Sequence, residues 1–311
     1  MPVNVKGRDF ITLADFSTEE ILHLLDTARE QKQQFNEHGS VELLKGRTLA
    51  CIFQKPSLRT RVSLEVAMIQ LGGSAVSMTG EEIGPGSREP VGDIARVLSR
   101  YVDVIAIRTF DHSMVEELAR YARVPVINAL TDYNHPCQVL ADLQTILEVK
   151  GRLKGLKLAY VGDGNNVAVS LLLGTSLMGM SMSLGCPEGY DVPEKVLEQA
   201  REEARKRGAG VDLTRDPREA VRGADVVYTD VWASMGQESE ADRRRPIFKP
   251  YQVNNDLLKD AREDAVVMHC LPAHYGDEIT AEVVEGPRSV VFDQAENRLH
   301  AQKAILLRIL G

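Results

Sequence analysis

The chain lacks the features that several broad classes of protein require. Its 37 lysines and arginines are outnumbered by 45 aspartates and glutamates, which gives a net charge of −8 over 311 residues. A nucleic-acid-binding protein needs a basic face, so this balance argues against a nucleic-acid partner while leaving room for a local cationic pocket. The length fits two domains, each large enough to bury a core of its own.

Cysteine patterns and long apolar segments are also missing. Cys51, Cys137, Cys186 and Cys270 are far apart and match no metal-binding or redox spacing, which is typical of a reducing compartment. The first ten residues contain no apolar run of signal-peptide length, so we expect a cytoplasmic protein. Residues 165–187 are uncharged, but serines and glycines interrupt them. We therefore expect a buried helix, a turn and a strand there, and no membrane span.

The glycine-rich loops of the common nucleotide sites are absent as well. In "VGDGNNV" (161–167), Gly162 and Gly164 follow an apolar run, but the third glycine position holds Val167. No acidic residue is placed after the next run to bind a ribose. The segment "KPSLRTR" (55–61) has no Gly-Lys-Ser/Thr ending of a Walker loop. These departures argue against a nicotinamide-dependent dehydrogenase and against a P-loop nucleotide site.

Short apolar runs that alternate with helical patterns make up most of the chain. The runs are rich in β-branched residues and lack strict alternation, as parallel strands covered on both faces do. They are 48–53, 102–109, 124–130, 156–162, 181–186, 224–230, 264–270 and 288–294. The pattern predicts an α/β fold with two mainly parallel sheets flanked by helices. A helix is expected over 17–35, where Ser17 and Glu20 form a capping box.

The polar and glycine-rich segment 148–157 reads as a domain boundary. We expect one domain over residues 1–148 and a second over 149–297, with a final helix, 298–311, that returns to the first domain. Ligands of open α/β sheets bind beyond the carboxyl ends of the strands. Polar residues of the kinds found in binding and catalytic sites end or follow six of the apolar runs. They are at residues 57–60, Arg108, 135–138, 163–166, 230–235 and 269–270.

The segment 57–60 begins a helix in the middle of a cationic stretch. A helix N-terminus presents free N–H groups and a partial positive charge, and an arginine beside it adds a forked donor suited to phosphate. Ser57 can also act simply as a cap, with Arg61 paired to Glu65 four residues later. We interpret Arg59 as a phosphate ligand and Arg61 as a partner of Glu65.

The segment "HPCQVLADLQTI" (135–146) begins a second helix of interest. Pro136 suits the first helical position, and His135, Gln138 and Asp142 then share one face. A histidine and a glutamine in this place can hydrogen-bond a carbonyl and an amide. His135 as a plain N-terminal cap is an equally good interpretation of this motif alone.

Five blocks together resemble the carbamoyltransferases, and most closely the ornithine carbamoyltransferases. They are "SLRTR", "HPCQVLAD", "GDGNN", "DVWASMG" and "HCLPAH", and the resemblance runs from about Asp9 to the C-terminus. The first two resemble the carbamoyl-phosphate signatures of the whole superfamily. "DVWASMG" and "HCLPAH" resemble the ornithine branch, whereas enzymes for aspartate, putrescine or acylated ornithine are not expected to show Ser-Met-Gly.

The resemblance implies two groups of binding residues. The carbamoyl-phosphate ligands would be Ser57, Leu58, Arg59, Thr60, Arg108, His135, Gln138 and Arg298. The ornithine ligands would be Asn166, Asp230, Ser234 and the Met235 backbone. Cys270 and the carbonyl group of Leu271 would lie near the reacting carbon.

The implied reaction transfers the carbamoyl group of carbamoyl phosphate to the δ-amine of L-ornithine, giving L-citrulline and phosphate. Thr60, Arg108 and His135 would stabilise the developing oxyanion, while Asp230 and Cys270 position the amine. The resemblance implies a reaction that needs neither a metal nor an organic cofactor. Two other hypotheses stay open: a different amine acceptor (lysine, putrescine or acylated ornithine), and a catalytically silent phosphate-binding relative.

Two positions depart from the family pattern. Leu58 stands where threonine is commonest, which matters little if that position acts through its backbone N–H group. Gly84, in "EEIGPGSRE" (81–89), stands where many relatives have a polar side chain that reaches a neighbouring subunit. The resemblance also implies a homotrimer built through the first domain, closure of the two domains, and a mobile loop at Ser234–Gly236.

Overall fold

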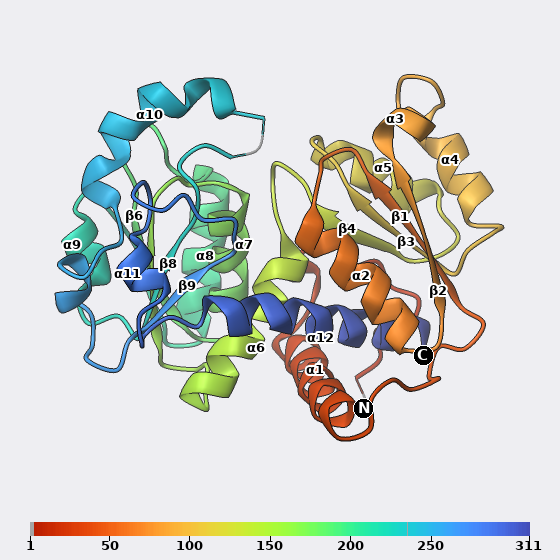
Figure 1. Cartoon of the computed structure of the whole chain (residues 1–311), viewed down its shortest axis with the longest axis horizontal. Coiled ribbons are helices and arrows are strands. Elements are labelled where there is room, and N and C mark those ends of the chain that lie inside the picture. Colours follow the sequence, from red (N-terminus) through yellow and green to blue (C-terminus); the bar gives the residue numbers. More distant parts are fainter. Residues whose placement is uncertain (1–2, 235) are drawn as a thin grey trace. The chain divides into compact units, whose positions relative to one another are not determined.

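The computed structural model describes residues 3–234 and 236–311. The chain divides into two compact units, one of Met1–Gln144 with Glu296–Gly311 and one of Thr145–Ala295. Each unit contains one parallel sheet flanked by helices (Figure 1). Among the helices that the structure describes, none is both long enough and apolar enough to cross a membrane.

The sheet of the first unit has four parallel strands in the order β2-β1-β3-β4. They are β1 (Thr48–Phe53), β2 (Ser74–Thr79), β3 (Val104–Arg108) and β4 (Val126–Leu130). The chain order reverses between β1 and β3, whose last residues Phe53 and Arg108 are register partners. In open parallel sheets the crevice at such a reversal is where ligands bind.

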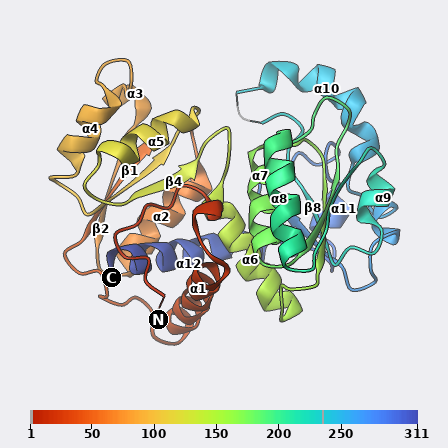
Figure 2. The same cartoon turned by 180° about the vertical axis from the view of Figure 1, so that it is seen from behind.

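The helices of the first unit cover this sheet and each other. They are α1 (Thr18–His38), α2 (Leu58–Gln70), α3 (Gly80–Ile83), α4 (Val91–Leu98), α5 (His112–Tyr121), α6 (Pro136–Lys150, which runs into the second unit) and the part of α12 (Val291–Leu310) from Glu296 onward, with the 3-10 turn η1 (Leu13–Asp15). Helices α4 and α5 pack on one face of the sheet, against Ile52, Ile105 and Ile107. Helix α12 lies beside α1 in both views (Figures 1 and 2), and Arg308 donates to the Thr27 hydroxyl at 2.7 Å. The C-terminal helix therefore packs on the first unit, as predicted.

The second sheet has five parallel strands in the order β7-β6-β5-β8-β9. They are β5 (Lys157–Val161), β6 (Ser181–Gly185), β7 (Val211–Thr214), β8 (Val226–Thr229) and β9 (Val266–His269). The chain order reverses between β5 and β8, which pair as far as Val161 and Thr229. The segments that begin at residues 162 and 230 therefore leave the sheet side by side.

Helices cover both faces of this sheet. They are α7 (Asn166–Leu177), α8 (Glu194–Lys206), α9 (Pro217–Val221), α10 (Ala241–Phe248) and α11 (Ala281–Val284), with 3-10 turns η2 (Glu238–Glu240), η3 (Lys249–Tyr251) and η4 (Leu257–Lys259). Helices α7 and α8 lie on the face seen in Figure 2. On the other face Val221 and Val283 of α9 and α11 join one buried cluster with Val161, Val227 and Val267.

Most local predictions are confirmed. Helix α1 begins after Ser17, whose side chain and that of Glu20 form the capping box, and seven of the eight predicted strands are present. The uncharged segment 165–187 forms α7 and β6. The predicted strand at 288–294 is wrong, because only Ser289 makes a β-bridge and α12 begins at Val291. An apolar run that short does not distinguish a strand from a helix start.

Two strands were missed, β2 and β7. Strand β2, "SAVSMT", lies at the edge of its sheet and none of its residues is fully buried. Strand β7 is also an edge strand and has four residues. Edge strands need fewer apolar residues than central strands, so neither carries the continuous apolar run used as the signal.

Candidate active site

The first candidate site begins where α2 starts, just beyond β1. Ser57 is the N-cap, and its hydroxyl accepts the Thr60 N–H group at 3.2 Å, as predicted. The Leu58 side chain is 74% exposed, so only its backbone belongs to this helix start. Arg61 points away to Glu65, with an Nε–Oε1 distance of 3.0 Å, which confirms the predicted pair.

Two arginines from distant parts of the chain converge on the Thr60 hydroxyl. Arg108, the last residue of β3, donates from Nη1 at 3.1 Å, and Arg298 of α12 donates from Nη2 at 2.7 Å. All three residues are at least 92% buried. Two guanidinium groups brought this close to one hydroxyl repel each other, and a bound anion would relieve that repulsion.

His135 and Gln138 complete this cluster at the start of α6. Burial, and then the charges of Arg298, Arg108 and Arg59, lower the pKa of His135 well below its usual 6.5, so the imidazole is neutral at pH 7. Gln138 accepts from Arg298 at 2.6 Å and donates to Asp142 at 2.9 Å. The Gln138 amide is thereby held in one orientation.

Two further residues of the first unit bear on the predictions. Lys55, at the start of the cationic stretch, is buried, forms an ion pair with Asp132 and lies 4.1 Å from the centre of the Phe110 ring. Gly84 ends α3 with a φ of +63°, and a Cβ atom there would lie 2.6 Å from the Arg88 Cβ atom. A side chain would be strained at this turn, which accounts for the glycine.

The second candidate site lies at the reversal point of the second sheet, around Asp230. This carboxylate follows β8 and is 5% exposed. Its Oδ2 accepts the Asn165 Nδ2 group at 2.7 Å, and its Oδ1 accepts the Cys270 thiol at 3.0 Å. Asn165 also caps α7, and the predicted ligand Asn166 is the first residue of that helix. Asn165 lies in the predicted polar segment 163–166 but had no predicted role, although an asparagine directly before a helix is a recognisable cap signal.

Cys270 and Leu271 lie on a tightly held turn after β9. Leu271 has a φ of +56°, the only described non-glycine residue with a positive value. His269 Nδ1 accepts the Leu271 N–H group at 2.8 Å, so the ring hydrogen is on Nε2, which faces the buried Glu278 carboxylate at 3.1 Å. His269 and Glu278 thus hold the backbone that presents Cys270.

Ser234 lies on the segment that joins β8 to η2, and its N–H group donates to the Gln237 side chain at 3.3 Å. Met235, also predicted as a ligand, lies outside the described residues.

Within the described residues, Asp230, His269 and Cys270 each offer a ligand atom within 4.8 Å of the others. An N, O and S set of this kind suits Zn²⁺. The Cys270 thiol, however, donates to Asp230, and both ring nitrogens of His269 are hydrogen-bonded, to Leu271 and Glu278.

Both clusters lie in segments that match a known protein family. Residues 8–148 match the family description "Aspartate/ornithine carbamoyltransferase, carbamoyl-P binding domain", and residues 154–309 match "Aspartate/ornithine carbamoyltransferase, Asp/Orn binding domain". The chain belongs to this family. The first cluster, around Thr60, lies within the first of these matches, and the second, around Asp230, lies within the other.

Individual family members are similar over the full length. The anabolic ornithine carbamoyltransferase of Pyrococcus furiosus is 54% identical over 311 residues, covering 100% of this chain and 99% of the relative. The ornithine carbamoyltransferase of Anoxybacillus flavithermus is 54% identical over 308 residues, 99% of this chain and 98% of the relative. A solved structure of the Pyrococcus furiosus enzyme has a TM-score of 0.97 with 99% of each chain covered, and one from Gloeobacter violaceus has a TM-score of 0.89 at 50% identity, covering 99% of this chain and 100% of that one. The resemblance seen in the five blocks and the predicted fold class are both confirmed.

Proposed function

We propose that this protein transfers the carbamoyl group of carbamoyl phosphate to the δ-amine of L-ornithine, giving L-citrulline and phosphate. The observation that carries the proposal is the convergence of Arg108 and Arg298 on the Thr60 hydroxyl, beside a neutral histidine. This cluster suits a small anion that also carries a polar, uncharged group. Full-length relatives named ornithine carbamoyltransferase support the same reaction.

In the proposed complex the first unit binds carbamoyl phosphate. The phosphate accepts N–H groups from the start of α2 and charged donors from the arginines, because a helix N-terminus and a guanidinium group both favour phosphate oxygens. Gln138 keeps its amide oxygen oriented, and one lone pair remains for the carbamoyl NH₂ group. The proposed ligands are Ser57, Leu58, Arg59, Thr60, Arg108, His135, Gln138 and Arg298.

The second unit binds ornithine in this proposal. Asp230 is the acceptor for a substrate amine, and Asn166, Ser234 and Met235 hold the α-amino and carboxylate groups. Asp230 is oriented by Asn165 and by the Cys270 thiol, so its carboxylate presents a fixed geometry to the substrate. Preorganised polar groups of this kind favour one substrate position over others.

The reaction starts when the neutral δ-amine attacks the carbamoyl carbon. Charge then develops on the carbonyl oxygen, where Thr60, Arg108 and His135 donate hydrogen bonds without having to reorganise. The C–O bond to phosphate breaks, and the leaving phosphate accepts the proton that the amine loses. Cys270 and the Leu271 carbonyl group hold the amine during attack.

A carbamoyltransferase with another amine acceptor is the alternative, and an acceptor panel separates the two. Purified protein with carbamoyl phosphate should form citrulline from ornithine with a kcat/KM at least about 100-fold above that for lysine, putrescine or N-acetylornithine. No citrulline from pure, folded protein would end the proposal. A better rate with another amine would replace ornithine as the acceptor.

We also propose the domain and assembly assignments that go with this function. Residues 1–148 with 298–311 form the carbamoyl-phosphate domain, and residues 149–297 form the ornithine domain.

A cytoplasmic homotrimer built through the first domain is proposed, with Gly84 near a neighbouring subunit. The assembly into a trimer is supported by an exposed apolar stripe on α2, which consists of Leu58, Val62 and Ile69. Light scattering at several concentrations tests the trimer. A role in arginine biosynthesis fits the relative named as anabolic.

A further inference from the structure

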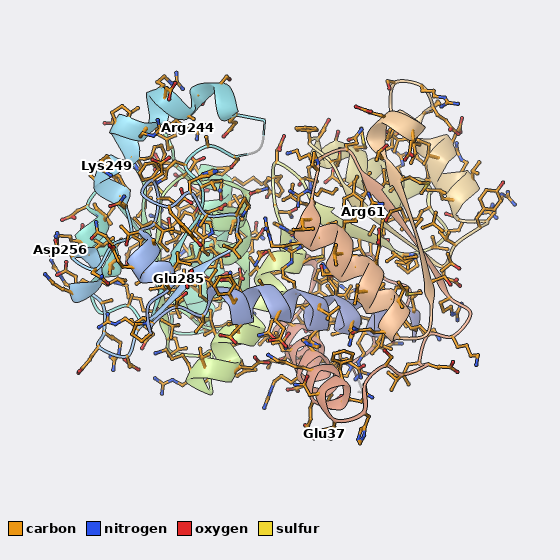
Figure 3. All side chains as sticks on the ribbon, in the orientation of Figure 1. Glu37, Arg61, Arg244, Lys249, Asp256 and Glu285 are labelled. Carbon is orange, nitrogen blue, oxygen red and sulfur yellow. The ribbon has the colours of Figure 1, made fainter. Side chains whose placement is uncertain are left out.

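Arg244 of α10 is a buried arginine that lies outside the residues assigned above. It is 6% exposed and is labelled in Figure 3. Its Nη1 donates to the Asp163 carboxylate at 2.8 Å and to the Trp232 carbonyl oxygen at 2.8 Å, and its Nε donates to Glu240 at 2.9 Å. One guanidinium group therefore joins three separate segments of the second unit.

This guanidinium group lies over an aromatic ring that belongs to a cluster of three. Its central carbon lies 5.0 Å from the centre of the Tyr190 ring. Phe248 packs edge-on against Tyr190 at 4.7 Å between ring centres and stacks with Trp232 at 5.9 Å. A cation held over an aromatic face and screened from water interacts more strongly with its carboxylate partners than an exposed one does.

Each hydrogen-bond partner of Arg244 is close in the sequence to a residue of the proposed ornithine site. Trp232 lies two residues before Ser234, and Glu240 lies six residues after it, so Arg244 holds both ends of the intervening segment. Asp163 precedes the turn that ends at Asn165, and its carbonyl oxygen accepts the Asn165 N–H group at 2.7 Å. Asn165 in turn holds Asp230.

We propose that Arg244 is a positioning residue for the amine acceptor: it ties the segment that carries Ser234 to the turn that orients Asp230. This inference rests on the proposed function. A buried arginine of purely structural importance would affect stability alone. Loss of a positioning residue for one substrate raises the KM for that substrate and leaves the KM for the other unchanged.

The test is steady-state kinetics on Arg244→Gln with Arg243→Gln as the matched control. Arg243 is the preceding residue and its side chain is 68% exposed; its one ion pair within the described residues is with Glu240, at 3.4 Å. We expect the KM for ornithine to rise about 10- to 100-fold in Arg244→Gln, the loss associated with a small misplacement of substrate ligands. The KM for carbamoyl phosphate should stay within about twofold, and Arg243→Gln should match the wild type.

Further variants separate positioning from stability and from the proposed function itself. Arg244→Lys keeps the charge but not the forked geometry, so it should fold and still show a raised KM for ornithine. Asp163→Asn combined with Arg244→Gln should be no worse than about twofold beyond Arg244→Gln alone, because both remove the same link. A folded Arg244→Lys and Arg244→Gln with wild-type KM for ornithine, or with both KM values raised equally, overturns the inference. A wild-type enzyme that makes no citrulline overturns the proposed function instead.

Discussion

Thr60 and Arg298 are joined by a hydrogen bond of 2.7 Å although 238 residues separate them along the chain. The bond ties the start of α2 to α12, and Arg108 donates to the same hydroxyl from the end of β3. A single oxygen atom thus accepts hydrogen bonds from two charged groups that are 190 residues apart in the sequence. Its removal should affect the site more than a surface hydroxyl would.

Replacement of Thr60 by valine tests this arrangement. Valine has the shape of threonine but cannot accept either guanidinium group, so both lose an acceptor in a buried place. We expect kcat/KM for carbamoyl phosphate to fall about 100- to 1,000-fold, as for loss of an oxyanion donor. Thr60→Ser keeps the hydroxyl and should retain most of the activity. Equal activity of Thr60→Val and Thr60→Ser would show that the hydroxyl has no role.

Arg59 and Arg61 provide a matched pair on α2. The charge of Arg59 acts on the buried His135, whereas Arg61 is paired with Glu65 and is labelled on the surface of α2 in Figure 3. Arg59→Gln should raise the KM for carbamoyl phosphate about 10- to 100-fold, because a charge-assisted phosphate contact is lost. Arg61→Gln should stay within about twofold. If the two variants have the same KM, the phosphate assignment of Arg59 is wrong.

Thiol labelling should single out Cys270. Burial raises the pKa of Cys51, Cys137 and Cys186 to about 12 in each case, so these thiols stay protonated and inaccessible at neutral pH. Cys270 is partly exposed. A chromogenic disulfide should therefore react with one thiol per native chain and with four after denaturation. The fast reaction should vanish in Cys270→Ser, and ornithine with carbamoyl phosphate should slow it; a second fast thiol would contradict this assignment.

The Asp163–Arg244 pair should make the binding of ornithine depend on pH. Burial raises the pKa of Asp163 from 3.8 to about 6, against the opposing charge of Arg244. As the pH falls through about 6, this carboxylate takes up a proton and its ion pair with Arg244 is lost. The dissociation constant of norvaline, which has no δ-amine, should therefore rise between pH 7 and pH 5 by titration calorimetry with carbamoyl phosphate present.

The control for this pH effect is Asp163→Asn. Its side chain is neutral at every pH, so norvaline should bind weakly and with a flat profile over the same range. The folded-state pKa is above the unfolded value, so the folded chain holds the extra proton between about pH 4 and 6. Ionisation of Asp163 therefore lowers the free energy of unfolding as the pH rises from about 4 to 6. Asp163→Asn should reduce this dependence of the free energy of unfolding on pH. An unchanged pH profile in Asp163→Asn would exclude Asp163 as the titrating group.

The sequence indicated those parts of the site that depend on neighbours three or four residues apart. The cap at Ser57, the pair Arg61–Glu65 and the shared face of Gln138 and Asp142 all follow from helix geometry, and the structure contains each of them. Arg298, by contrast, entered only through the resemblance to the carbamoyltransferases. Nothing in the local pattern of α12 distinguishes it from a surface arginine.

Contacts across strands could not be read from the sequence. Asn165 carried a cap signal, yet its bond to Asp230 exists only because β5 and β8 are neighbours in the second sheet. Arg244 was missed because its neighbours in sequence, Arg243 and Arg245, are exposed and its partners lie on three segments. Residues 288–294 were misread because α12 begins inside a short apolar run.

The sequence by itself determined the two-sheet α/β architecture, most of the strands and the helix starts that carry Ser57 and Asn166, because apolar runs and caps act over a few residues. Only the tertiary structure decided which polar residues meet. Strand order places the ends of β1 and β3, and of β5 and β8, side by side. Packing then buries Arg298 and Arg244, and a buried guanidinium group must be surrounded by acceptors, which the fold collects from distant segments.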